Sequence, residues 1–112
     1  MTSISKALLD SDTLSLYIKQ IQPVEQNARD YIYAIGPFTF SIITTFEISR
    51  GMKARGAFAQ LIDFQRLCAV SDVVNLNDDI VSIAGDVYSQ LRSSGQIVGD
   101  ADILIAATAL HI

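Results

Sequence analysis

The chain has 112 residues, half of them apolar, and a net charge of −4. It is long enough for one folded domain over residues 1–112 and too hydrophobic for a disordered protein. No apolar run approaches the roughly 18 to 20 residues that cross a membrane, and the first residues lack the pattern of a signal peptide. These features predict a cytoplasmic protein without a membrane partner. The negative charge argues against electrostatic binding of nucleic acid over a broad surface, so any contact with nucleic acid must be local. The single cysteine, Cys68, forms no internal disulfide and is most often a core residue.

Short apolar runs alternate with helical patterns along the whole chain. Proline and glycine mark several of the boundaries, such as Pro23, Gly36 and Gly56. A threonine followed three residues later by an acid, Thr44 and Glu47, predicts a capping box at a helix start. The expected elements are a strand at residues 7–9, a helix through 14–18, a helix at 23–35, a strand at 38–43, a helix from 44 to about 53, a helix at 57–67, a strand at 73–76, a long helix through 80–91 and a last helix at 103–110.

This alternation predicts an α/β fold in which a short parallel sheet is covered on both faces by helices, giving three layers. The last helix is apolar on nearly every face, so we expect it to be buried. In parallel sheets, functional groups gather beyond the carboxyl ends of the strands. Asp10 and Glu47 both fall at that edge.

Each acid also has a purely structural explanation. Asp12 and Asp100 suit helix N-caps, Glu47 suits the capping box, and Asp102 in a first helical turn suits the helix dipole. Asp10 fits such an account least well, because a carboxylate at the end of an apolar strand loses hydration and faces another acid two residues later. Several carboxylates from separate segments form an oxygen-only site of the kind that binds Mg²⁺ or Mn²⁺.

Three segments, ALLDSD, IITTFEISRG and GDADILIAATAL, occur in this order, with VVNLND and a long helical pattern between the last two. Together they resemble the PIN-domain family, especially the VapC-type toxin ribonucleases of prokaryotic toxin–antitoxin pairs. The resemblance covers nearly the whole chain. It places Asp10, Glu47 and Asp102 on the family's metal-binding and catalytic acids, adds Asp100 as a further metal ligand, and makes Asp12 and Thr44 accessory residues.

The resemblance implies an endoribonuclease that depends on Mg²⁺ or Mn²⁺, with RNA as substrate and an antitoxin protein as partner. Three of the eight basic residues, Arg50, Lys53 and Arg55, lie within six positions. We predict that they bind the RNA backbone beside the acids, although a solvated helix end explains them equally well.

The family continues past its last helix into further strands, whereas here the sequence stops at His111 and Ile112. We therefore expect the C-terminal strands to be missing, the first strand to have an open edge, and a homodimer to cover it. Two other functions stay open. One is a catalytically incomplete PIN module that acts by binding. The other is a haloacid-dehalogenase-type phosphatase, suggested by LLDSDTL, although Thr13 follows Asp12 directly and the motif is out of frame. The RNA target and the identity of the antitoxin are not evident from the sequence.

Overall fold

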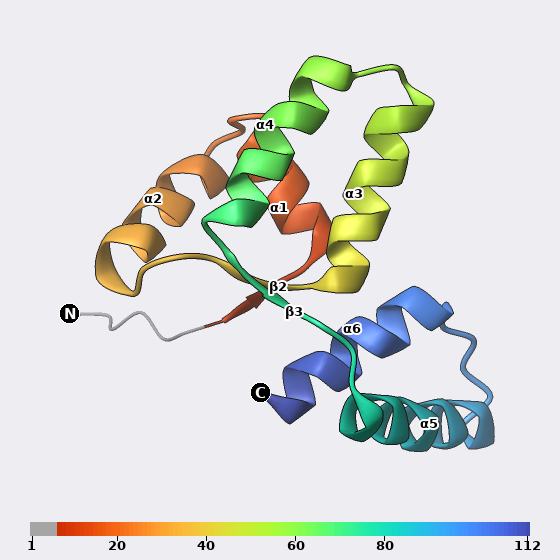
Figure 1. The fold of residues 1–112 in the computed structure, drawn as a ribbon. Coiled ribbons are helices and arrows are strands. Elements are labelled where there is room, and N and C mark those ends of the chain that lie inside the picture. Colours follow the sequence, from red (N-terminus) through yellow and green to blue (C-terminus); the bar gives the residue numbers. More distant parts are fainter. Residues whose placement is uncertain (1–6) are drawn as a thin grey trace.

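The computed structural model describes residues 7–112 and consists of a parallel sheet with helices on both of its sides (Figure 1). The predicted three-layer α/β fold is confirmed. In chain order the elements are β1 (Leu8–Leu9), α1 (Ser11–Ile18), α2 (Val24–Ala34), β2 (Thr39–Ser41), α3 (Ile42–Ala54), α4 (Phe58–Ala69), β3 (Asp72–Val74), α5 (Asp78–Ser93) and α6 (Asp100–His111).

The sheet has the strand order β1-β2-β3, with all neighbours parallel. Strand β2 lies in the middle and is buried along its whole length, which explains its run of aromatic and β-branched residues. Phe40 pairs with Leu9 on one side and with Val73 on the other. Because the strands are parallel, β1 and β2 both end at the edge where α1 and α3 begin.

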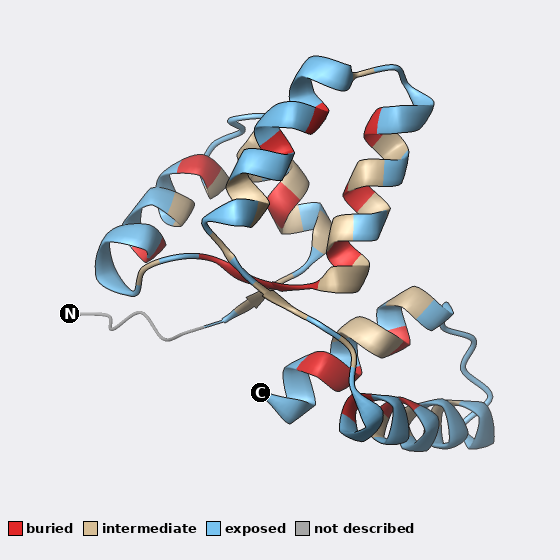
Figure 2. Cartoon of the chain, viewed as in Figure 1, coloured by how far each residue is buried: buried red, intermediate tan, exposed pale blue. Residues whose placement is uncertain are grey.

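The apolar side chains form two cores. Figure 2 shows buried positions on both sides of the sheet. The larger core lies between the sheet and helices α1 to α4, and its most deeply buried side chains include Leu14, Phe38, Phe40 and Phe64. The smaller core joins α5 to α6 and also contacts the end of β3. Figure 1 shows α5 and α6 on the opposite side of the sheet from the other helices.

The predicted capping box is wrong, because α3 begins earlier than expected. Strand β2 stops at Ser41, whose hydroxyl accepts a hydrogen bond from the Ile43 backbone N–H at 3.0 Å. Ser41 is therefore the N-cap, and Thr44 and Glu47 both lie inside the helix. The carboxylate of Glu47 is not needed for capping and is free for another role.

The caps of α1 and α6 also differ from the prediction. Asp10, not Asp12, caps α1, and its Oδ1 accepts a hydrogen bond from the Thr13 backbone N–H at 2.8 Å. Helix α6 starts at Asp100 and has Gly99 as its N-cap, with no side-chain hydrogen bond. Asp102 does lie in the first turn of α6, as predicted.

Burial of α6 is less complete than expected. Ile103, Ala107 and Thr108 are buried, but Leu110 is 68% exposed. Only one face of the helix packs against α5 and α3, and the apolar residues elsewhere on it reach the surface. Within residues 7–112, no helix is both long and apolar enough to cross a membrane.

Candidate active site

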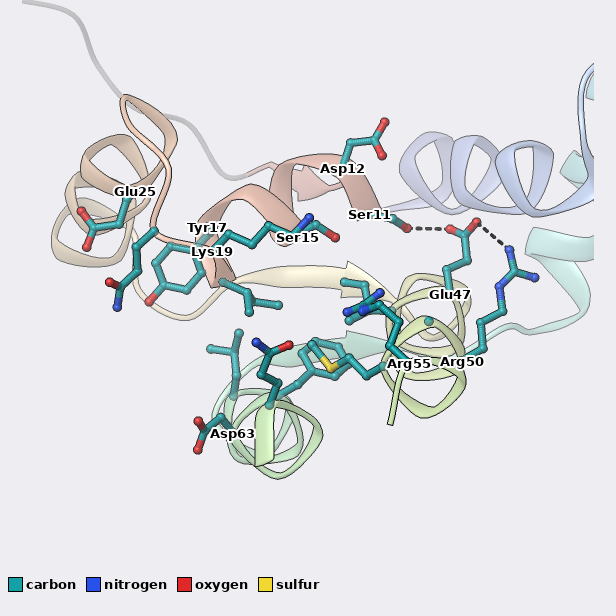
Figure 3. A pocket seen from close by; sticks show the side chains of 18 of the residues that line it. Ser11, Asp12, Ser15, Tyr17, Lys19, Glu25, Glu47, Arg50, Arg55 and Asp63 are labelled. Carbon is teal, nitrogen blue, oxygen red and sulfur yellow. Dashed lines mark hydrogen bonds and ion pairs between the residues drawn. The ribbon is translucent and has the colours of Figure 1, made fainter. Parts of the chain in front are cut away.

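Glu47 connects the start of α1, which lies in the ALLDSD motif, with α3, which carries the IITTFEISRG motif. It lies in the second turn of α3, and only 20% of its side chain is exposed. Its Oε1 accepts a hydrogen bond from the Ser11 hydroxyl at 2.6 Å, so the first residue of α1 is joined to α3 (Figure 3). The carboxyl ends of β1 and β2 thus come together, as the pattern of a parallel sheet predicts.

Arg50 lies one turn further along α3 and faces the same carboxylate. Its Nη2 is 4.0 Å from Glu47 Oε2, and its guanidinium carbon lies 5.2 Å from the centroid of the Phe46 ring. The aromatic ring and the carboxylate therefore hold the guanidinium from two sides. Figure 3 shows Ser11 and Arg50 approaching Glu47 from opposite directions.

A hollow of about 940 Å³ opens beside Glu47 and is lined by α1, α2, α3 and α4. Four basic and four acidic side chains line it, together with apolar residues. Two of the basic residues, Arg50 and Arg55, were predicted to bind RNA. Its lining includes Ser11, Asp12, Lys19, Glu25, Arg29, Glu47, Ile48, Arg50, Gly51, Met52, Arg55, Asp63 and Phe64.

The two acids at the start of α1 lie differently. Asp10 is exposed and does not line the hollow, because its carboxylate caps the helix. Asp12 lines the hollow, but Figure 3 shows its carboxylate turned away from Glu47. Exposure of Asp10 to water removes most of the desolvation that its position after an apolar strand suggested.

The acids of α6 stand apart from this hollow. Asp100 and Asp102 are both exposed and do not line it, although α6 packs against α3. Within residues 7–112, no three side chains of His, Cys, Asp or Glu lie close enough together to hold a metal ion. The structure brings Ser11, Glu47 and Arg50 together but leaves Asp102 outside.

A divalent cation remains compatible with these residues by donor type. Carboxylate and hydroxyl oxygens are the ligands that Mg²⁺ and Mn²⁺ prefer. Glu47 and Ser11 already share a hydrogen bond, Asp10 adjoins Ser11, and Asp102 lies in the first turn of α6, which contacts α3. The side chains as they lie do not surround a common point, so the metal site stays a prediction.

The other predicted site residues have varied positions. Thr44 is fully buried, and its hydroxyl oxygen has no hydrogen-bond partner within residues 7–112. Lys53 is exposed and does not line the hollow. Cys68 is half-buried against the larger core, and burial raises the pKa of its thiol, so the thiol stays protonated at neutral pH.

Sequence reasoning missed Ser11, Lys19 and Arg29. Ser11 lies between the two acids of ALLDSD, and a hydroxyl inside an acidic motif was the signal that could have identified it. Its hydroxyl is the one that donates to Glu47, whereas the hydroxyl of the predicted accessory residue Thr44 is buried without a partner within residues 7–112. Lys19 and Arg29 carry no local signal, because only the packing of α1 and α2 brings them to the hollow.

The geometry agrees with the comparison with known proteins, in which the family model for the PIN domain matches residues 7–112. The chain belongs to the PIN-domain family. It is 30% identical over 106 residues to Ribonuclease VapC1 of Methanocaldococcus jannaschii. The aligned region covers 95% of this chain and 69% of that relative. It is 32% identical over 105 residues to Ribonuclease VapC10 of Mycobacterium tuberculosis, covering 91% of this chain and 73% of that one.

Solved PIN-domain structures share the fold. VapBC2 from Rickettsia felis, bound to a DNA fragment from its promoter, superposes with a TM-score of 0.80 at 16% identity, over 92% of this chain and 78% of that one. DNA-bound VapBC from Salmonella typhimurium gives a TM-score of 0.78 at 21% identity, over 93% and 78%. The predicted kinship with VapC-type PIN domains is therefore confirmed, and the hollow around Glu47 is the candidate active site of such a domain.

Proposed function

We propose that this PIN domain is a VapC-type endoribonuclease, the toxin of a toxin–antitoxin pair, and that it hydrolyses RNA phosphodiesters with the help of Mg²⁺ or Mn²⁺. The observation that carries the proposal is the shielded Glu47 carboxylate, held by the Ser11 hydroxyl and bordered by two arginines at the wall of an open hollow. A carboxylate can hold a metal ion or accept a proton, and nearby guanidinium groups can bind phosphate oxygens.

The names of the relatives support both parts of this proposal. The two sequence relatives are called ribonucleases, and the structural neighbours are complexes described as VapBC or as toxin–antitoxin. From this we infer that RNA is the substrate and that an antitoxin protein is the partner. The PIN fold also disfavours the phosphatase function, whose motif was already out of frame.

The predicted site residues and Ser11 have separate parts in the proposed mechanism. Ser11 donates its hydroxyl proton to Glu47 and so fixes the direction of the carboxylate. Asp10, Glu47 and Asp102 are the proposed ligands of the cation, with Asp100 in support. When bound, such a cation supplies positive charge to the scissile phosphate and makes an attacking water easier to deprotonate. A carboxylate of this set can accept the proton of that water.

The arginines of α3 serve the substrate. Arg50 and Arg55 line the hollow beside Glu47, so their guanidinium groups can bind phosphate oxygens next to the scissile bond. Such contacts fix the position of the RNA backbone without reading its bases. Lys53 contributes at most a weaker contact outside the hollow.

Substitution of Glu47 tests the proposal. Glutamine keeps an oxygen that can accept the Ser11 hydrogen bond but removes the charge, so Glu47→Gln should fold normally and cut RNA about 100-fold more slowly or worse. Asp86→Asn is the matched control, because Asp86 is an exposed carboxylate of α5 that does not line the hollow. The measurement is cleavage of a labelled single-stranded RNA with Mg²⁺, Mn²⁺ or EDTA. A folded Glu47→Gln variant that cuts at the parental rate would contradict the proposal.

One observation favours a second function. Asp100 and Asp102 lie outside the hollow, which fits a PIN module that has kept its binding surfaces but not its turnover. In that case RNA or the antitoxin would bind without any metal-dependent cleavage. The same assay, combined with RNA binding measured by fluorescence anisotropy, separates the two functions.

A further inference from the structure

A glycine on the wall of the hollow has a neighbour that a side chain would displace. Gly51 lies four residues after Glu47 and four before Arg55, so the three residues follow one stripe of α3. A Cβ atom built on Gly51 would lie 3.3 Å from Arg55 Nη1. The end of the Arg55 side chain therefore lies over Gly51, one turn closer to Glu47 than its own backbone.

Helix geometry explains this direction. Side chains on an α-helix lean toward its N-terminus and cover the preceding turn. Arg55 directly follows α3 and is its C-cap. Its long side chain therefore runs back along the helix toward the hollow. Gly51 is the position that this side chain must pass, and a glycine leaves the most room there. Figure 3 shows Glu47, Arg50 and Arg55 together along this helix.

We propose that Gly51 is a positioning residue, whose missing side chain lets Arg55 lie along α3 and bind the RNA phosphate next to the one at Glu47. This inference rests on the proposed ribonuclease function and adds a determinant of RNA affinity to it. Glycine is a poor helix former, so its presence inside α3 comes at a cost in helix stability. Room for Arg55 is the use that the structure gives it.

The first step of the test is to block the space by degrees. Gly51→Ala requires the guanidinium to shift slightly, whereas Gly51→Met fills its place, and both new residues favour helix. We expect KM for RNA to rise a few-fold in Gly51→Ala. In Gly51→Met and in Arg55→Gln it should rise on the order of tenfold, and kcat should be nearly unchanged in all three variants. Gly85→Ala and Gly85→Met are the controls, because Gly85 is a helical glycine with nothing within 4 Å of an added Cβ.

Salt dependence gives a readout that a structural effect cannot imitate. The slope of log affinity against log salt for single-stranded RNA should shrink by about 0.7 when one phosphate contact is lost. Arg55→Gln should show this change, and Gly51→Met should show it too, although it removes no charge. Binding is measured by anisotropy in the Glu47→Gln background, so that the RNA stays intact.

The double variant Gly51→Met/Arg55→Gln shows whether Gly51 acts through Arg55. If it does, the double variant binds RNA as Arg55→Gln does, with no further loss. A further loss in the double variant, or an unchanged KM and salt slope in both Gly51 variants, would overturn the inference. A parent protein that neither cuts nor binds RNA would instead overturn the proposed function, on which the inference rests. Thermal melting of every variant confirms that it is folded.

Discussion

Asp10 caps helix α1 and is also the first of the proposed metal ligands. Asparagine caps a helix about as well as aspartate, whereas alanine costs about 1 kcal/mol at such a position. In metal-free protein, Asp10→Asn should therefore melt close to the parent, and Asp10→Ala should melt lower. Because Asp10 is exposed, we expect little gain from relief of charge repulsion in Asp10→Asn.

Addition of metal separates the two roles of Asp10. Mg²⁺ or Mn²⁺ that binds the folded protein should raise its melting temperature, and this rise should be smaller or absent in both Asp10 variants. The measurement is thermal unfolding at increasing metal concentration, with Asp86→Asn as the control. If the parent gains no stability from either metal, the shared site of Asp10, Glu47 and Asp102 is wrong. If metal raises the melting temperature of Asp10→Asn as much as that of the parent, Asp10 is not a ligand, although Glu47 and Asp102 could still be.

At the scale of single elements, the start of α3 offers a second test. Ser41→Ala removes the observed N-cap and should lower the free energy of unfolding by about 1 kcal/mol. Thr44→Val removes a buried hydroxyl that has no partner within residues 7–112, so it should leave stability unchanged or raise it. Urea unfolding of both variants gives the numbers. If Thr44→Val lowers the free energy of unfolding as much as Ser41→Ala does, Thr44 stabilises the start of α3 as the capping-box prediction says.

The elements themselves were predictable from the sequence, but several of their ends were not. Apolar periodicity and the turn residues Pro23, Gly36 and Gly56 located the three strands and six helices of residues 7–112. Ser41 and Thr44 can both cap a helix, and nothing local decides between them, because the choice depends on where pairing with β1 and β3 ends. The exposure of α6 was missed because its apolar residues point in all directions, and only tertiary contacts select the buried face.

The candidate site shows the same division. The carboxyl edge of the sheet follows from the α/β pattern, and Glu47 was found there. Which hydroxyl reaches Glu47 depends on how α1 packs against α3, so the sequence did not identify Ser11. The position of Asp102 depends on how α5 and α6 pack against α3, which no motif specifies. Spacing finds the element that carries a residue, and packing decides where its side chain lies.

The charges of the whole molecule are divided between its two parts. Seven of the eight basic residues fall within residues 1–66, and six aspartates but only one arginine lie in residues 67–112. Residues 1–66 also hold six acids and are therefore nearly neutral, whereas α5 and α6 form an acidic part on the other side of the sheet. An RNA strand is repelled by the second part and not by the first, so it should approach Glu47 over α1, α3 and α4.

The predicted homodimer is also a property of the whole molecule. The strand order leaves β1 and β3 at the edges of the described sheet, and the leucines of β1 are only half-buried. Helix α6 adds apolar surface, because Leu110 is mostly exposed. Strand edges and apolar surface favour contact with another chain, and two-fold dimers are the commonest form of self-association.

Light scattering at low micromolar concentration measures the mass directly, and we expect that of a dimer. Leu110→Lys should shift the protein toward monomer if α6 contributes to the contact, because a buried lysine loses its hydration. Ile62→Lys is the matched control, since Ile62 is a half-exposed apolar residue of α4, on the other side of the sheet from α6. Dissociation by Leu110→Lys alone would place the interface at α6, and dissociation by Ile62→Lys alone would move it to α4. A folded parent protein with the mass of a monomer would show that these edges need no partner, and the dimer prediction would be wrong.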